Sequence, residues 1–348
     1  MLNIQTEILY LIQRFGMVIF TINITASSGD SGRVPIDVAG SVMFNAQSII
    51  SMIGEHSVRH ALSLQGIVPE DLLSRFILYI DSSSSSISST ADMRFDGPGS
   101  MLKDALFGLI FLFECLNSGS FSELKEKYPD PFRRRNILNG LLSLLKGLRG
   151  FELNYSDGER SGSLSSSGSM LTEMLAGEIM CFTGEIVGVL KRTEDGTFLR
   201  VSNRDVPIPS GRDDLFGMPC KVSGRVFLSE DGKAERIAEV YTIDKLSEMS
   251  FGRMISADID LVLSSSIRAE VSYDSEHELW TLSSKPLGIS ISKEDLDEAI
   301  IEFHDQFVFM WEIYYEGAAE GESDEEYEEE ELEVRNFIIS LVKEVGSR

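Results

Sequence analysis

The chain of 348 residues contains little cysteine and few long apolar runs. Its three cysteines, Cys115, Cys181 and Cys220, lie far apart and form no CxxC or CxxxC pair. This spacing argues against a disulfide framework and against a cysteine-based zinc site, so we expect a reducing, cytoplasmic location. The apolar run Leu106–Leu116 has only 11 residues. A helix that crosses a bilayer needs about 20, so we interpret this run as a core helix.

Basic residues are also scarce. The chain has 31 Lys and Arg against 56 Asp and Glu, and its formal net charge is -25. The field of the whole molecule therefore repels nucleic acid, anionic membranes and phosphorylated substrates, and it attracts a basic partner. Because 43% of the residues are hydrophobic, the chain can bury real cores, and its length favours several domains.

Motifs that carry known chemistry are missing: there is no GxSxG elbow, Walker loop or GxGxxG turn. His56 and His60 have the spacing that lets two imidazoles share a metal on a helix, but Ser57 stands where an HExxH motif has its glutamate. Asp258 and Asp260 fall on one face of a predicted strand, as paired carboxylates would. We predict no catalytic residues, no metal and no cofactor, and we keep a metal-dependent hydrolase as one alternative.

The pattern of elements predicts an α+β protein of several domains. Residues 1–176 form an N-terminal α+β domain in this interpretation, with helices packed against a small antiparallel sheet. We expect its strands at residues 17–26, 75–81 and 86–95, an amphipathic helix between Pro35 and Gly54, and a buried helix at residues 97–116.

Residues 177–250 change to short strands separated by turn signals, which predicts five strands in a small OB-like or SH3-like barrel. Barrels of this kind often bind oligonucleotides through a basic groove with stacking aromatic side chains. This segment carries more acidic than basic residues, and its phenylalanines are more typical of a barrel core. A rigid spacer or docking platform is therefore the interpretation that we favour.

One segment departs from the acidic character of the chain. Residues 121–150 carry seven basic residues against three acidic ones, and Arg133, Arg134 and Arg135 stand together. The leucines that follow keep helical spacing, which indicates an amphipathic helix with a charged outer face. The alternative is a helix that contacts phosphates, and we keep a nucleic-acid-associated protein that uses the barrel and these arginines as the second hypothesis.

Residues 251–316 predict a compact module of three strands and one long helix. Alternating apolar residues at 267–273 indicate the first strand, and residues 280–282 and 287–291 give the other two. We expect Ser292 to cap the helix together with Asp295, as in a capping box. From Leu296 to Tyr314, apolar residues recur at steps of three and four, which predicts a strongly amphipathic helix.

Four short motifs of this module resemble the HicB-like antitoxin family: Tyr273-Asp274, Trp280, Leu287-Gly288-Ile289 and Leu296-Asp297-Glu298-Ala299. The resemblance covers residues 267–315. It implies a truncated RNase-H-like fold without catalytic carboxylates, which binds and covers a small basic toxin ribonuclease. Members of the family commonly append a DNA-binding segment, whereas here an acidic stretch follows the helix.

Eleven acidic residues lie between Glu316 and Glu333, and residues 317–348 are predicted to form an acidic linker and a final helix. Such a run attracts a basic partner and raises its rate of association. We predict a non-catalytic interaction or regulatory protein, antitoxin-like in its action, which binds a basic protein such as a small toxin ribonuclease. The residues expected to contact the partner are Tyr273, Trp280, Phe309, Ile313, Glu328 and Glu329.

Overall fold

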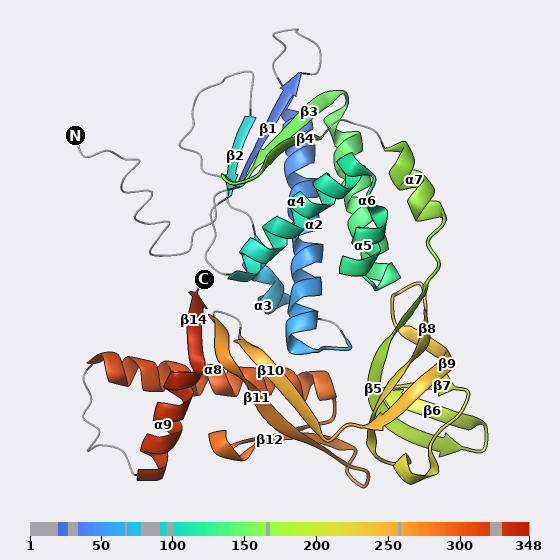
Figure 1. The fold of residues 1–348 in the computed structure, drawn as a ribbon, viewed down its shortest axis with the longest axis vertical. Coiled ribbons are helices and arrows are strands. Elements are labelled where there is room, and N and C mark those ends of the chain that lie inside the picture. The colour runs from blue at the N-terminus through green and yellow to red at the C-terminus, as the bar shows by residue number, and fades with distance from the viewer. Residues whose placement is uncertain are drawn as a thin grey trace. The chain divides into compact units, whose positions relative to one another are not determined.

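The computed structural model describes residues 20–26, 34–66, 68–77, 91–95, 100–164, 168–256, 259–320 and 329–347. It divides into two compact units. The first unit comprises the described residues up to Ser57 together with Leu73–Ile179, and the second comprises Val58–Leu72 and Met180–Ser347. Helices and three antiparallel sheets make up the described residues, so the prediction of an α+β chain is confirmed (Figure 1).

The first unit contains a four-stranded antiparallel sheet in the order β2-β1-β3-β4. Its outer face is polar and lines an open groove of about 540 Å³. Its inner face is apolar, because alternate residues of β1, such as Ile22 and Ile24, are fully buried beside Leu153 and Tyr155 of β3. The strand bounds are Phe20–Ala26 for β1, Ala91–Phe95 for β2, Phe151–Ser156 for β3 and Ser161–Leu164 for β4.

Helices cover the apolar face of this sheet (Figure 1). The predicted core helix is α4, and its Phe113 packs on Tyr155 of β3 with the ring centroids 5.1 Å apart. The strand expected at residues 75–81 is wrong at its start, because Ser74–Phe76 form a 3-10 turn; residues 78–81 lie outside the described part. The helices are α2 (Ile36–Leu62), α4 (Ser100–Ser118), α5 (Phe121–Lys127), α6 (Pro131–Leu148) and α7 (Ser169–Ala176), and the short α3 (Glu70–Leu73) belongs to the second unit.

Helix α2 does not stop near Gly54, where we expected its apolar face to end, but continues to Leu62. Gly54 lets the ring of Phe76 pack directly on the helix backbone, because a Cβ at this position would lie 2.4 Å from that ring. By length and composition, α2 is the one described helix that could cross a membrane, a test that the core helix of a soluble protein also meets.

A five-stranded antiparallel sheet fills residues 181–245 of the second unit, in the order β7-β6-β5-β8-β9. The two edge strands β7 and β9 also contact each other, so the sheet curls around its own apolar side chains. These include Leu190, Leu199, Val222 and Val226, all of which are fully buried. The bounds are Cys181–Thr193 for β5, Gly196–Val201 for β6, Arg204–Ile208 for β7, Pro219–Leu228 for β8 and Ala234–Lys245 for β9.

The third sheet is built around one long strand, β11, which pairs with β10 along one edge. On its other edge, residues 270–274 pair with β12 and residues 259–263 pair with β14. The strand β13 extends the sheet beyond β12, and β14 was not expected from the sequence. The bounds are Glu248–Ile255 for β10, Ile259–Asp274 for β11, Leu279–Ser284 for β12, Ile289–Lys293 for β13 and Val342–Ser347 for β14.

Helix α8 (Leu296–Glu320) packs across this sheet, with Phe303 and Phe307 fully buried, and α9 (Glu329–Leu341) packs beside it. The expected cap at Ser292 is wrong. Ser292 belongs to β13, where its hydroxyl bonds that of Thr281 at 2.7 Å. Asp295 caps the helix instead, since its carboxylate accepts the backbone N–H of Asp297 at 2.7 Å.

A glycine-to-alanine pair in α2 tests the close packing at Gly54. We expect Gly54→Ala to lower the free energy of unfolding by about 1–3 kcal/mol, because the added methyl collides with the Phe76 ring. Gly40→Ala in the same helix has no atom within 4 Å of its new Cβ and should be neutral, or stabilising by about 0.5–1 kcal/mol. Urea midpoints of both variants measure this, and equal midpoints would contradict the packing.

Candidate functional site

Helix α8 presents one continuous exposed stripe to solvent. Its members are spaced by three or four residues and therefore share one face of the helix: Glu298, Glu302, Asp305, Phe309 and Ile313. The first three are acidic, whereas Phe309 and Ile313 keep 57% and 48% of their surface exposed. Two of the side chains predicted to contact a partner thus lie at the apolar end of a stripe, hereafter the α8 stripe, whose other end is acidic.

An open groove of about 490 Å³ begins beside the acidic end of the stripe, within the second unit. Three segments line it: residues 200–203 in the β6–β7 turn, residues 273–280 in the β11–β12 hairpin, and residues 294–298 around the start of α8. Glu298 belongs both to the groove and to the α8 stripe. The groove and the stripe are therefore parts of one continuous surface.

Tyr273 and Trp280 form one wall of the groove, which brings together two more of the predicted partner-binding residues. They are cross-strand partners in β11 and β12, and their rings meet edge to face with centroids 5.2 Å apart. Trp280 is only 4% exposed, so most of its side chain packs in the core while one edge lines the groove. Burial raises the pKa of Tyr273, which keeps its hydroxyl protonated.

The charges in the groove do not balance. Glu278 pairs with Lys191 at 3.0 Å, and Arg200 pairs with Asp205 at 2.5 Å. Lys191 lowers the pKa of Glu278, and Arg200 lowers that of Asp205, so both pairs stay ionised and cancel their own charges. What remains around the start of α8 is a set of carboxylates without a basic partner within ion-pair distance among the described residues: Glu294, Asp295 and Glu298.

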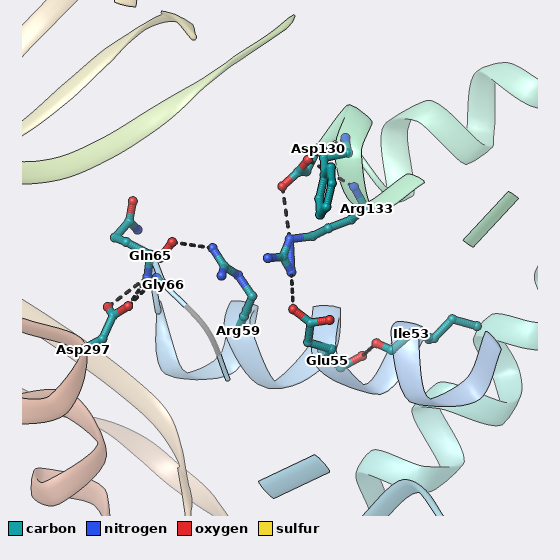
Figure 2. Close-up of polar contacts among 10 residues, drawn as sticks. Ile53, Glu55, Arg59, Gln65, Gly66, Asp130, Arg133 and Asp297 are labelled. Carbon is teal, nitrogen blue, oxygen red and sulfur yellow. Dashed lines mark hydrogen bonds and ion pairs between the residues drawn. The ribbon is translucent and has the colours of Figure 1, made fainter. Parts of the chain in front are cut away.

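Asp297 points away from this set and holds a distant segment of the same unit. Its buried carboxylate accepts the backbone N–H of Gln65 at 2.9 Å and that of Gly66 (Figure 2). Arg59, at the end of α2, donates to the carbonyl oxygen of Gln65 at 2.7 Å and stiffens the same turn. A Cβ on Gly66 would lie 2.8 Å from the carboxylate oxygen, so any larger residue here would require the carboxylate to shift. This contact was not predicted from the sequence.

Burial dominates the titration of Asp297. Desolvation raises its pKa, while the bonds from Gln65 and Gly66 and the nearby Arg59 lower it, and Asp295 adds to the rise. The pKa of Asp297 is therefore raised overall. The docked carboxylate is therefore held in place by hydrogen bonds at the cost of its hydration.

His304 and Asp260 are engaged within the core of the third sheet. The backbone N–H of Ile255 donates to Nδ1 of His304 at 3.1 Å, and burial lowers the pKa of this histidine to about 3, so it is neutral. Asp260 is 2% exposed and pairs with Arg253 at 2.8 Å. Asp258, its expected partner in a carboxylate pair, lies outside the described residues.

The two helical histidines do not form a site in the described structure. The ring of His56 lies edge to face on Tyr128, with centroids 5.1 Å apart, and His60 is exposed near the end of α2. Within the part of the chain that the structure describes, no group of three or more His, Cys, Asp and Glu side chains is arranged to hold a metal ion.

The three consecutive arginines have different surroundings at the start of α6. Arg133 pairs with Asp130 at 3.1 Å and with Glu55 of α2 at 3.2 Å (Figure 2). Arg134 is 6% exposed and donates to the carbonyl oxygens of Tyr128 and Pro129 and to the carboxylate of Glu178. Arg135 alone points to solvent. A phosphate-binding cluster of all three would require breaking contacts that hold the first unit together.

The acidic run is partly helical. α8 continues to Glu320 and α9 begins at Glu329, so both ends of the run are helical, and residues 321–328 lie outside the described part. Glu329, one of the predicted partner contacts, is therefore the first residue of a helix, and Glu328 lies outside the described residues. Comparison of the chain with protein-family models, with curated proteins and with solved structures finds no match.

A neighbouring pair of arginines tests the structural role of Arg134. We expect Arg134→Ala to lower the free energy of unfolding by about 3–5 kcal/mol, because it leaves Glu178 buried without its partner. Arg135→Ala should change stability by less than about 0.5 kcal/mol. Denaturation curves measure both, and the nucleic-acid hypothesis requires in addition that Arg135→Ala weaken retention on single-stranded DNA.

Asp297 can be tested by removing either its charge or its acceptor. Asp297→Ala leaves two backbone N–H groups unpaired and should destabilise by about 1–3 kcal/mol per group. Asp297→Asn keeps an acceptor and removes the desolvation cost. Since the folded-state pKa is raised, folding binds a proton more tightly, and wild-type stability falls as pH rises from the ordinary aspartate pKa through the raised value.

The stability of Asp297→Asn relative to wild type should therefore increase across that pH interval, as measured by urea midpoints from pH 3 to pH 8. A difference that is constant, or that declines with rising pH, would contradict the direction of the shift.

Proposed function

We propose that the chain is a non-catalytic protein-interaction protein, antitoxin-like in its action, which binds a basic partner protein in the cytoplasm through the α8 stripe and the neighbouring groove. The observation that carries the proposal is the arrangement of the stripe, in which exposed Phe309 and Ile313 continue an acidic face. Exposed apolar residues beside a charged rim are typical of protein interfaces.

The negative charge of the chain also supports a basic partner. The net charge of -25 and the unbalanced carboxylates around the start of α8 both favour a positively charged partner. The acidic residues would accelerate and orient the encounter, while Phe309 and Ile313 would supply the apolar area that slows dissociation.

A finer proposal concerns the fold. We propose that β11, β12, β13 and α8 form a HicB-like module, and that β5–β9 form an OB-like or SH3-like barrel. The succession of three strands and a helix supports the first part, and the contact between β7 and β9 supports the second. β10 and β14 are additions that the resemblance does not imply. The partner of such a module would be a small basic ribonuclease.

Affinity recovery from extract of the native cells tests the function when it is paired with two matched variants. The stripe variant Phe309→Ser/Ile313→Ser should lose the partner, because it removes the apolar contact. The control Ile179→Ser/Tyr241→Ser replaces two apolar residues elsewhere that are somewhat more exposed, at 68% and 54%, and should retain the partner. Mass spectrometry must identify a basic protein, and its affinity for the stripe variant should fall about tenfold or more.

Two further outcomes bear on this proposal. Recovery that is equal for the stripe and control variants, or recovery of nucleic acid without a basic protein, would contradict it. The ribonuclease part requires that the recovered partner cleave RNA and that added wild-type chain suppress the cleavage.

A further inference from the structure

The groove beside α8 carries three features that together define a ligand chemistry. It has an aromatic wall, a surplus of negative charge, and a hydrogen-bond donor without a partner. The first is the pair Tyr273 and Trp280, and the second is the set Glu294, Asp295 and Glu298. Acidic residues in the first turn of a helix also stabilise that helix, so the charge alone does not identify a ligand.

The donor is the indole N–H of Trp280. Trp280 is only 4% exposed, and it lines the groove. Its Nε1 makes no hydrogen bond to any residue that the structure describes, and it is not among the unpartnered polar atoms that are sealed from solvent. The small part of Trp280 that solvent reaches therefore includes its only polar side-chain atom. Tryptophan N–H groups in such surroundings normally have an acceptor.

We propose that the groove receives an arginine side chain from the basic partner, with the guanidinium between the Tyr273 ring and the carboxylates of Glu294 and Glu298, and with Trp280 Nε1–H donating to a backbone carbonyl oxygen of the partner. This inference rests on the proposed function. A guanidinium is planar, stacks on aromatic rings and offers five donors in a fixed fork, so it can engage several carboxylates at once. An ammonium group has compact, strongly hydrated charge and uses an aromatic wall less well.

The position of the groove agrees with this assignment. Arg200 and Lys191 of the chain are already occupied by Asp205 and Glu278, so they do not neutralise the remaining carboxylates. Glu298 joins the groove to the α8 stripe. An arginine in the groove would thus fix the register in which the apolar part of the partner lies on Phe309 and Ile313.

Titration of the full chain with two short peptides tests the proposal. The probes are acetylated, amidated peptides of alternating glycine and arginine, or of alternating glycine and lysine, with the same charge. The chain has two tryptophans, so a Trp311→Phe background leaves Trp280 as the sole reporter. We expect the arginine peptide to shift the Trp280 emission and to bind about fivefold or more tightly than the lysine peptide.

Matched charge variants distinguish binding by the groove carboxylates from attraction by the net charge of the whole chain. Glu294→Gln/Glu298→Gln should weaken the binding of the arginine peptide about tenfold in calorimetric titration. The control Glu230→Gln/Glu235→Gln removes the same charge from exposed sites outside the groove and should weaken it less than about twofold. Trp280→Phe keeps an aromatic side chain, loses the donor and should weaken binding by a factor between these two.

Equal losses in the groove and control variants, absence of a Trp280 response, or absence of binding would each overturn the arginine assignment. None of these results contradicts the proposed function, which fails if the partner remains bound when Phe309 and Ile313 are replaced, or if nucleic acid is recovered without a basic protein. Loss of the partner on changing the α8 stripe, with no loss on changing the groove, would leave the function standing and remove this inference.

Discussion

The start of helix α8 is the constraint on which the second unit depends. Asp295 caps the helix, and the next carboxylate along its first turn, Asp297, is committed to the backbone of Gln65 and Gly66. With these two groups fixed, the buried residues of α8 face the third sheet, and the exposed stripe can lie in only one direction. The groove inherits this geometry, because residues 294–298 form one of its three sides.

The same helix divides its acidic residues by function. Asp297 is buried and structural, whereas Glu298, one residue later, is exposed and faces a groove without a basic partner. A strongly acidic chain can thus use part of its charge to stabilise a helix start and leave another part for recognition. The arginines of α6 show the reverse arrangement. Arg133 and Arg134 form ion pairs with Asp130, Glu55 and Glu178, so most of this basic cluster is neutralised within the chain.

Periodicity predicted the elements of this chain better than it predicted their ends or their partners. The alternation of apolar residues placed the strands of the β5–β9 sheet and of the β11–β13 meander, because a half-buried strand must alternate. The 3.6-residue repeat placed α8. One error came from local chemistry: Ser292 has the side chain of a cap but lies in a strand. Gly54, which bounded the predicted apolar face of α2, makes room for Phe76 within the helix.

The candidate site was harder to predict from the sequence than the helices and strands. Phe309 and Ile313 were identifiable because they fall outside the main apolar stripe of their helix. The groove was not, since it joins segments around residues 200, 277 and 296 that only the fold brings together. The role of Asp297 was hidden for the same reason, because its partners lie 232 and 231 positions away.

That separation also has a meaning for how the molecule is made. Residues 58–72 leave the ribosome early, but the carboxylate that receives them is synthesised more than two hundred residues afterwards. During that interval Leu62, Leu64 and Val68, all buried in the finished unit, have no second unit to enter. Long-range closure of this kind is slow and leaves apolar surface uncovered. These three apolar side chains therefore stay without their final packing until α8 has been synthesised.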